Sequence, residues 1–257
     1  MTALRCGMKR PWVIAHRGVS ADFPENTATA FDAACSLPVD GLELDLQLSR
    51  DGVVMVYHDR TLKKLGLPRR RVSGLSHAEL SKLDAGGWFD HRFSGERLLT
   101  LDQVLDRYAG QIPLMLEVKL RGGIRSEKNH RLLIHAVVRT LIARRLTDKV
   151  HLLSFGLHLL EVAQALAPNL RCVWNLEKPP KWDTLLRSQV AGLAAVCVNA
   201  RAMTPDFVRA CHDLGTPVLT FTINRAEQAA AAIASGADGL ISDRPGWLLG
   251  YLDERER

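Results

Sequence analysis

The sequence lacks the long hydrophobic runs, internal repeats and biased segments that mark membrane-spanning, solenoid or disordered proteins. No apolar run approaches the roughly 18 residues that a membrane span needs, which excludes an integral membrane protein. Its 257 residues, 47% hydrophobic and 24% charged, are ordinary for a soluble globular protein. That length suffices for one large core, so we expect a single domain covering residues 1–257.

Cysteine is scarce, odd in number and scattered. The five cysteines include no Cys-x-x-Cys pair, which argues against both a disulfide framework and a thiolate zinc site. We expect them to be small buried side chains. They are Cys6, Cys35, Cys172, Cys197 and Cys211.

A secretory signal is also lacking. The basic residues Arg5, Lys9 and Arg10 precede Trp12, but no apolar run follows them before the first predicted strand. The expected location is the cytoplasm.

The net charge of +6 is moderate, and its distribution does not favour nucleic acid as a partner. The densest basic cluster, Lys63, Lys64 and Arg69–Arg71, is short and has no interleaved aromatic residues. A solvated surface loop explains it most simply. The alternative is that these side chains gather anionic substrates or touch a lipid headgroup surface.

Eight strand-like apolar runs alternate with amphipathic segments, a pattern typical of a parallel sheet. The predicted strands are Trp12–Ala15, Gly41–Leu46, Leu114–Lys119, Val150–Ser154, Leu170–Trp174, Ala195–Val198, Pro217–Thr222 and Gly239–Ile241. The predicted helices include Thr27–Cys35, Glu127–Arg145, Leu157–Leu166, Pro205–Leu214 and Ala226–Ser235. Eight strand–helix units in about 250 residues predict a closed α/β barrel of the (β/α)8 TIM type, with a doubly wound open sheet as the alternative.

The stretch between His58 and Thr100 breaks this rhythm. It is rich in Gly, Lys and Arg, and a short helix with capping-box spacing is predicted over Ser76–Lys82. A connection of this length is usually functional or a small subdomain. We therefore expect a small insertion after the second strand, over about residues 60–98.

Three carboxylates are predicted to meet at one end of the barrel. Glu43 and Asp45 alternate along the second predicted strand, so they point to the same face, roughly 6.6 Å apart. Glu117 lies near the end of the neighbouring strand and faces the same mouth. Carboxylates that converge without a counter-charge repel unless a cation joins them, and hard oxygen ligands select Mg²⁺ or Ca²⁺ over Zn²⁺. The alternative is that they pair with lysine or arginine inside the barrel.

Two histidines follow strand ends at this mouth. His16 follows the first predicted strand, and His58 follows a short apolar run over Val53–Tyr57. Histidine titrates near neutral pH, so one can act as a base and the other as an acid. The other histidines have ordinary positions; His151, for example, begins a strand at the opposite end of the barrel.

Cationic side chains stand beside both clusters. Arg17 can present a bidentate fork to a phosphate, and Lys119 adds a point charge. Glu25 and Asn26 precede a predicted helix, so they either cap it or hydrogen-bond within the site.

Ordered motifs cover nearly the whole chain, from about Trp12 to about Leu249. They are His16-Arg17-Gly18, Pro24-Glu25-Asn26-Thr27, Glu43-x-Asp45, Asp51-Gly52, His58-Asp59, Asp84-Ala85-Gly86, Trp88-Phe89, Leu116-Glu117-Val118-Lys119, Ser154-Phe155, Phe221-Thr222-Ile223-Asn224 and Gly239-Leu240-Ile241-Ser242-Asp243-Arg244-Pro245. This ordered set resembles the glycerophosphodiester phosphodiesterase family.

The resemblance implies a TIM-type barrel that acts on small molecules. Its expected reaction is the hydrolysis of glycerophosphodiesters, such as glycerophosphocholine or glycerophosphoethanolamine, to sn-glycerol 3-phosphate and an alcohol. It also implies one divalent cation, Mg²⁺ or Ca²⁺, as the cofactor.

The same resemblance implies roles for individual residues. The implied acid–base pair is His16 and His58. The implied metal ligands are Glu43, Asp45 and Glu117. The implied contacts to phosphate and substrate are Arg17, Lys119 and the pocket-lining Phe221.

Two other functions stay open on sequence grounds. A lysophospholipase D would use the same site on a lysolipid, with a wider apolar mouth supplied by Leu65, Leu67, Trp88 and Phe89. A barrel that only binds a phosphorylated metabolite is the second alternative, although both histidines and all three carboxylates are kept. The sequence does not specify the alcohol, the attacking group (water or the substrate's own 2-hydroxyl) or the oligomeric state.

Overall fold

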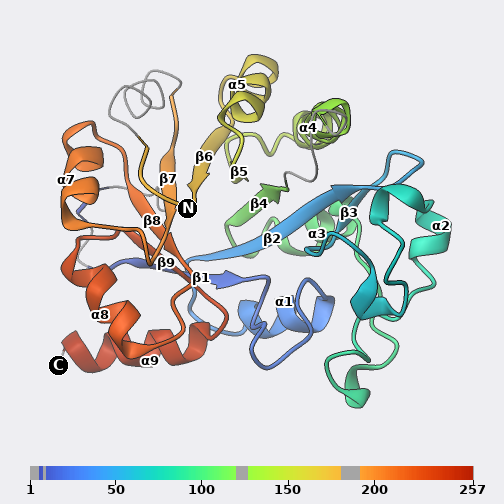
Figure 1. Cartoon of the computed structure of the whole chain (residues 1–257), viewed down its shortest axis with the longest axis horizontal. Helices are drawn as coiled ribbons and strands as arrows, with labels where there is room; N and C mark the ends of the chain where they lie inside the picture. Colours follow the sequence, from blue (N-terminus) through green and yellow to red (C-terminus); the bar gives the residue numbers. More distant parts are fainter. Residues whose placement is uncertain (1–5, 8–9, 120–126, 181–191, 257) are drawn as a thin grey trace.

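The fold is a closed barrel of parallel strands with one antiparallel extension (Figure 1). The computed structural model describes residues 6–7, 10–119, 127–180 and 192–256. Within them, one sheet of nine strands runs in the order β1-β9-β8-β7-β6-β5-β4-β2-β3, and a further β1–β2 pairing closes it. The predicted closed barrel is therefore confirmed, and the open-sheet alternative is wrong.

The barrel strands are those that the sequence predicts, with small shifts at their ends. They are β1 Trp12–His16, β2 Gly41–Leu48, β4 Leu114–Val118, β5 Val150–Ser154, β6 Arg171–Leu176, β7 Ala195–Asn199, β8 Val218–Phe221 and β9 Gly239–Ser242. The remaining strand, β3 (Val54–Val56), pairs antiparallel with the outer end of β2.

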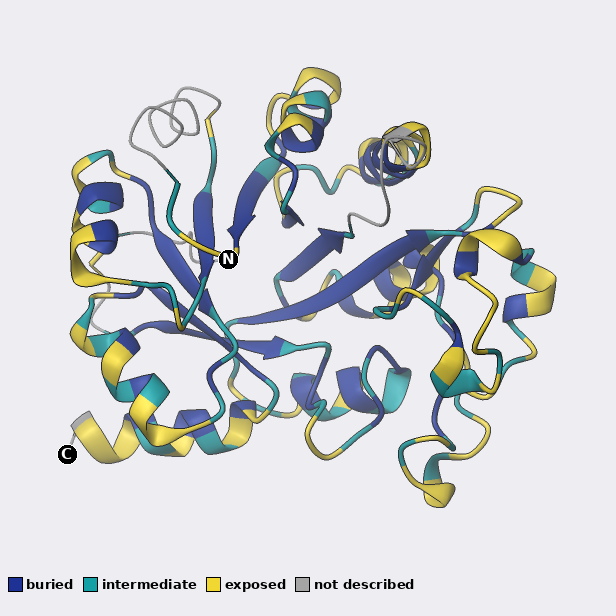
Figure 2. Cartoon of the chain, viewed as in Figure 1, coloured by how far each residue is buried: buried dark blue, intermediate teal, exposed yellow. Residues whose placement is uncertain are grey.

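Helices cover the outside of the barrel, with buried faces toward the strands and exposed faces toward solvent (Figure 2). Their bounds are α1 Ala28–Cys35, α3 Leu101–Tyr108, α4 Glu127–Ala143, α5 Leu157–Leu166, α7 Pro205–Asp213, α8 Ala226–Ala234 and α9 Pro245–Glu256. The five predicted helices are confirmed. Helices α3 and α9 were not predicted, although α3 begins with a capping box of Thr100 and Gln103 that the sequence already contains.

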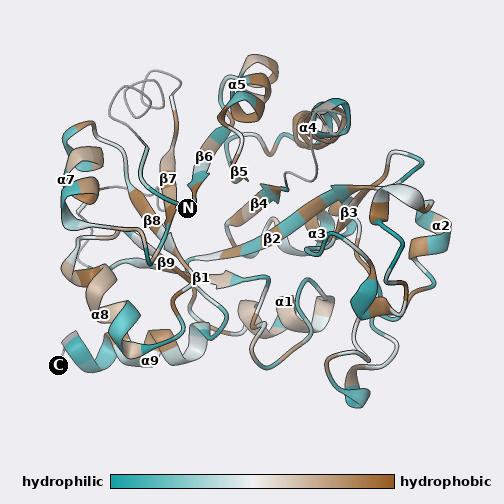
Figure 3. Ribbon diagram, viewed as in Figure 1, coloured by the Kyte–Doolittle hydropathy of each residue, from teal (hydrophilic) through white to brown (hydrophobic). Residues whose placement is uncertain are grey.

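Alternation along the strands divides the barrel interior into an apolar floor and a polar mouth. Ile14 and Met115 belong to a buried apolar cluster contributed by barrel strands. Two residues further along the same strands stand His16 and Glu117, which line the mouth. Residues i and i+2 of a strand share a face, so the same inward row changes from apolar to polar at the carboxyl ends. Figure 3 shows the hydrophobic character of strands such as β8.

Two rings help to close the floor. The ring of Trp12 meets that of His151 edge-on, with centroids 6.3 Å apart. His151 is buried near the start of β5, as predicted. Burial, together with the charge of Arg171, lowers its pKa to about 4, so this imidazole is neutral at neutral pH.

The segment between β3 and α3 has a small core of its own. Met55 and Tyr57 pack there with Leu75 and Leu80, the last of these in the short α2 (His77–Leu80). Helix α2 carries the predicted capping box. Three 3₁₀ helices complete the segment, Lys63–Leu65, Val72–Gly74 and His91–Phe93.

The cysteines only partly follow the expectation of burial. All are free thiols; Cys172, Cys197 and Cys211 are buried, whereas Cys6 and Cys35 are partly exposed. In the described part of the chain, none of the helices combines the length and the apolar character needed to cross a membrane.

Candidate active site

A cavity of about 850 Å³ opens at the carboxyl ends of the barrel strands. Each of the eight barrel strands, or the residue directly after it, contributes to its lining. In strand order these residues include His16, Glu43, Glu117, Leu153, Asn175, Cys197, Phe221 and Ile241. This is the face at which barrel enzymes carry their active sites.

Strand register brings the three predicted carboxylates together. Asp45 on β2 stands opposite Glu117 on β4, and Glu43 stands opposite His16 on β1. The carboxylates of Glu43, Asp45 and Glu117 each offer an oxygen within 4.8 Å of the others, and all three residues are buried. The predicted convergence is therefore present in the structure.

Two of these carboxylates also have the counter-charges that the sequence reasoning treated as an alternative. Lys119 Nζ lies 2.9 Å from Asp45 Oδ1 and 2.8 Å from Glu117 Oε1. Arg17 Nε lies 3.0 Å from Asp45 Oδ2. The expectation that all three carboxylates converge without a counter-charge is therefore wrong for Asp45 and Glu117.

These ion pairs set the charge states of the site. Burial alone would raise the pKa of Asp45, but Lys119 and Arg17 outweigh it and hold that pKa far below its usual range. Burial also opposes the charged form of Lys119, yet Asp45 and Glu117 raise its pKa. Asp45, Lys119 and Arg17 are therefore all charged at neutral pH.

Glu43 is the carboxylate left without compensation. Neither of its buried oxygens accepts a hydrogen bond from the described residues. The nearest basic nitrogen is His16 Nε2, at 3.9 Å from Oε2. Burial, reinforced by Asp45 and Glu117, raises the pKa of Glu43 well above its usual value. A buried, unpaired carboxylate beside two others fits a hard divalent cation such as Mg²⁺ or Ca²⁺.

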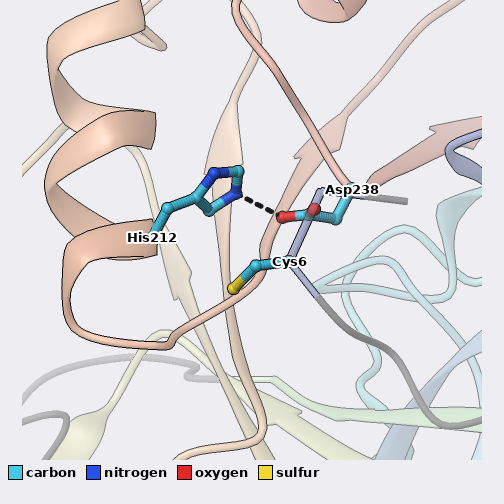
Figure 4. A group of neighbouring side chains, drawn as sticks. All are labelled: Cys6, His212 and Asp238. Atoms are coloured by element: carbon cyan, nitrogen blue, oxygen red, sulfur yellow. Dashed lines mark hydrogen bonds and ion pairs between the residues drawn. The ribbon is translucent and has the colours of Figure 1, made fainter. Parts of the chain in front are cut away.

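Another group of potential metal ligands consists of Cys6, His212 and Asp238 (Figure 4). The carboxylate in this group, unlike that of Glu43, has hydrogen-bond partners. The carboxylate of Asp238 already accepts hydrogen bonds from the backbone N–H groups of Gly7 and Val218 and interacts with His212 Nε2, each at 2.7 Å. The Asp238 carboxylate is therefore already occupied by these three partners, which come from separate segments of the chain. Among the described residues, Glu43, Asp45 and Glu117 are the group that best fits a metal.

Each predicted catalytic histidine is held by a carboxylate. His16 Nδ1 lies 2.5 Å from Asp243 Oδ1, and His58 Nδ1 lies 2.7 Å from Asp59 Oδ1. Burial would raise the pKa of Asp243, but its hydrogen bond and charge interaction with His16 lower it to about 2. Burial lowers the pKa of His58, even though Asp45 opposes this effect. Such carboxylate partners fix the ring orientation and the tautomer.

The Asp243 carboxylate is itself oriented. Asn224 Nδ2 donates to its Oδ2 at 2.6 Å, and Ser20 Oγ donates to its Oδ1 at 3.1 Å. The role of Asp243 was missed in the sequence, where it stood in the final motif without an assigned function. Its position directly after β9 was the signal that placed it at the mouth.

Arg17 and Gly18 form a tight turn after β1. Arg17 has a left-handed backbone with φ 59°, which is uncommon outside glycine and is typical of functional sites. Its N–H donates to Glu43 O at 2.8 Å. Gly18, with φ 86°, lies against α1, where an added Cβ would stand 2.5 Å from Ala30 O. Only glycine allows this close approach.

Glu25 and Asn26 belong to the site, and Thr27 caps α1 instead. Asn26 Nδ2 donates to Asp45 Oδ2 at 2.8 Å, and Glu25 Oε2 accepts from Arg17 at 3.0 Å. The question that the sequence left open between capping and site contacts is settled in favour of the contacts.

Lys64, from the predicted insertion, joins this network. Its Nζ lies 2.9 Å from Glu25 Oε1, 3.3 Å from Asp59 Oδ2 and 4.5 Å from the centre of the Trp88 ring. Lys64 was predicted only as part of a basic cluster, either solvated or gathering anionic substrates, and not as a partner of site residues. No local pattern signals a contact with Glu25, 39 residues earlier in the chain.

Aromatic side chains at the ends of β5 and β8 form part of the cavity wall. Phe221 lines it, as implied, and meets Phe155 edge-on with centroids 6.0 Å apart. By contrast, Leu65 and Leu67 pack against the small core of the insertion. Together with Trp88 and Phe89, they are not among the described residues that line the cavity, so the apolar mouth expected of a lysolipid enzyme is not formed by them.

Comparisons with known proteins indicate one family. The sequence profile of the Glycerophosphoryl diester phosphodiesterase family matches residues 16–247. A glycerophosphodiester phosphodiesterase from Caldanaerobacter subterraneus subsp. tengcongensis is 30% identical over 242 residues, covering 93% of this chain and 97% of that protein.

Solved structures show the same fold. A phosphodiesterase from Oleispira antarctica, in complex with the product sn-glycerol-3-phosphate, aligns with a TM-score of 0.83 at 28% identity, covering 95% of this chain and 97% of that one. A glycerophosphodiester phosphodiesterase from Agrobacterium tumefaciens str. C58 aligns with a TM-score of 0.77 at 24% identity, covering 94% of this chain and 100% of that one.

Proposed function

The chain belongs to the glycerophosphoryl diester phosphodiesterase family, and we propose that it hydrolyses glycerophosphodiesters with a divalent cation and a pair of histidines. Glycerophosphocholine and glycerophosphoethanolamine represent the substrate class, and the products are sn-glycerol 3-phosphate and an alcohol. The product complex of the Oleispira antarctica relative supports this choice. The observation that carries the metal dependence is the buried, uncompensated carboxylate of Glu43.

Glu43, Asp45 and Glu117 would hold the cation through carboxylate oxygens. When bound, a divalent cation polarises a phosphate oxygen and stabilises the negative charge that grows in the transition state. Arg17 and Lys119 line the same cavity and are fixed by Asp45, so they are already oriented to bind the phosphate.

The two histidines are positioned for proton transfer. Asp243 holds His16 through Nδ1, so the other ring nitrogen, Nε2, faces Glu43 and the cavity. Asp59 holds His58 in the same manner through Nδ1. One histidine removes a proton from the attacking hydroxyl group, and the other protonates the departing alkoxide.

The test is release of sn-glycerol 3-phosphate from glycerophosphocholine and glycerophosphoethanolamine, before and after chelation and with Mg²⁺ or Ca²⁺ restored. We expect activity to disappear with chelation and to return with one of the ions. We expect Glu43→Gln to lose most activity at every ion concentration. Full activity after exhaustive chelation would contradict the metal role, and no hydrolysis under any condition would contradict the proposed function.

A further inference from the structure

A second cavity, of about 590 Å³, lies between the outer end of β2 and helix α4. Its volume falls in the range of small-molecule sites. One side is apolar, with Leu132, Leu133 and Ala136 of α4. The other side is basic, with arginines from separate parts of the chain.

The second cavity adjoins the catalytic one. Glu43 lines the first cavity, and Gln47, on the same face of β2 and roughly 13 Å along the strand, lines the second. His58 lines the first cavity, and Arg60, two residues later, lines the second. Lys119 lines both. One small molecule that occupies the catalytic mouth can therefore extend into this space.

Several polar groups of the second cavity are already paired. Arg50 binds Glu79 at 2.9 Å, and Gln47 Nε2 donates to the carbonyl oxygens of Tyr57 and Asp59 at 2.8 and 2.9 Å. The carboxylate of Asp51 accepts from Ser49 Oγ at 2.6 Å and from the backbone N–H of His77 at 3.0 Å. Asp51 is the acidic residue among the described lining, and its carboxylate already accepts these hydrogen bonds.

Three arginines that line this cavity have no carboxylate partner among the described residues. In the described ranges, no carboxylate oxygen lies within 4.0 Å of a guanidinium nitrogen of Arg60, Arg71 or Arg139. They come from the segment after β3, the start of a 3₁₀ helix, and α4, yet they line one cavity. All three are exposed, and solvated arginines are common on surfaces. What distinguishes these three is that they line one concave space without a carboxylate partner, and several guanidinium groups around one space can bind a phosphate dianion.

We propose that this second cavity binds a phosphomonoester, the terminal phosphate of a substrate whose leaving alcohol is itself phosphorylated. The inference rests on the proposed hydrolysis of glycerophosphodiesters and names the preferred members of that class. The reacting diester lies at Glu43 and His16, the carbon atoms of the alcohol pass along the apolar side of α4, and the terminal phosphate meets the three arginines. Alcohols with a cationic group are disfavoured there.

The test compares two substrates that differ in one phosphate, sn-glycero-3-phosphoglycerol and its terminally phosphorylated form. We expect the wild-type kcat/KM to be about tenfold higher for the phosphorylated form, because its terminal phosphate gains charge-assisted hydrogen bonds to the arginines. In Arg60→Ala/Arg139→Ala the ratio falls close to one, while kcat/KM for the unphosphorylated form is unchanged. The control Arg92→Ala/Arg209→Ala removes the same charge from exposed positions elsewhere and keeps the wild-type ratio.

A binding measurement separates this inference from the proposed function. Calorimetric titration with methyl phosphate needs no turnover, and we expect Arg60→Ala/Arg139→Ala to lose one binding event that the wild type and the control retain. Identical binding in all three proteins would overturn the second site, even if both substrates are hydrolysed. Loss of binding together with an unchanged substrate ratio would overturn the assignment to the leaving alcohol, because the site would then serve a free phosphomonoester. Failure to hydrolyse either substrate, with binding lost in the variant, would contradict the proposed function alone.

Discussion

The ammonium group of Lys64 lies 2.9 Å from Glu25 Oε1, and this contact connects the predicted insertion to the Arg17 side of the mouth. Glu25 in turn binds Arg17, and Lys64 also reaches Asp59, the partner of His58. A continuous row of charges thus links the arginine expected to bind phosphate with a histidine expected to move protons.

Lys64 is therefore expected to act as a positioning residue. Lys64→Met keeps the length and the apolar stem but removes the charge, and we expect kcat to fall roughly 10–100-fold, the usual effect of a partner that orients a catalytic group. Lys64→Arg should restore much of the activity. The pH–rate profile should shift in Lys64→Met, because Asp59 loses a cation and interacts differently with His58. Lys63→Met, at the exposed neighbouring position, is the control. Equal activity of the two methionine variants would contradict this role.

The two histidines should be individually essential. We expect His16→Ala and His58→Ala each to lower kcat by roughly 10²–10⁴-fold, the usual contribution of general acid–base catalysis. Turnover of glycerophosphocholine measures this, with circular dichroism to confirm folding. His91→Ala changes an exposed histidine of the insertion and should keep full activity. Wild-type rates in both site variants would show that the proton transfers use other groups.

Metal-free stability should separate two of the carboxylates. In chelator, Glu43→Gln should melt at or above the wild-type temperature, because it removes a buried charge that has no compensating partner. Asp45→Asn should melt clearly below it, because Arg17 and Lys119 are then buried without their shared carboxylate. Added Mg²⁺ or Ca²⁺ should raise the melting temperature of the wild type much more than that of Glu43→Gln. The opposite order of the two variants in chelator would contradict the charge assignment.

His151 should make the barrel sensitive to acid. Its pKa is about 4 in the folded state, below its ordinary value of 6.5, so the unfolded chain binds the proton more tightly between these values. Stability is therefore full above pH 6.5 and falls as the pH drops toward 4. The contribution is about 2 kcal/mol between pH 7 and pH 5.

Urea unfolding at these two pH values measures the effect in wild type and in His151→Leu. The leucine variant should lose about 2 kcal/mol less on acidification than the wild type does. His91→Leu, at an exposed position, should behave as the wild type. An unchanged pH dependence in His151→Leu would assign the acid sensitivity to other groups.

The sequence predicted the parts of the site that depend on strand geometry. The alternation of Glu43 and Asp45 and the position of Glu117 at a strand end were sufficient to bring three carboxylates together, because parallel strands meet at one mouth. The structure confirms this arrangement through the pairing of Asp45 with Glu117.

The parts that depend on long-range pairing were not predictable in the same manner. The contact of Asp243 with His16 spans 227 residues, and that of Lys64 with Glu25 spans 39. No periodic pattern in the sequence predicts either contact, because each depends on how a loop folds back toward the mouth of the barrel. The pairing of Lys119 with both Asp45 and Glu117 was also not predicted. The sequence indicated the charge of Lys119 but not which of the nearby carboxylates it would bind.

The apolar floor determines where small molecules can enter and leave the barrel interior. The cluster that includes Trp12, Ile14 and Met115 fills the amino-terminal half of the barrel interior, so the interior is not a channel. In the described part of the chain, the barrel interior therefore opens at the carboxyl ends of the strands, and substrate, water and both products of the proposed reaction would pass there. In the proposed reaction, the departing alcohol and the glycerol phosphate would therefore share this exit, and the product held more tightly by the basic side chains there would be the slower to leave.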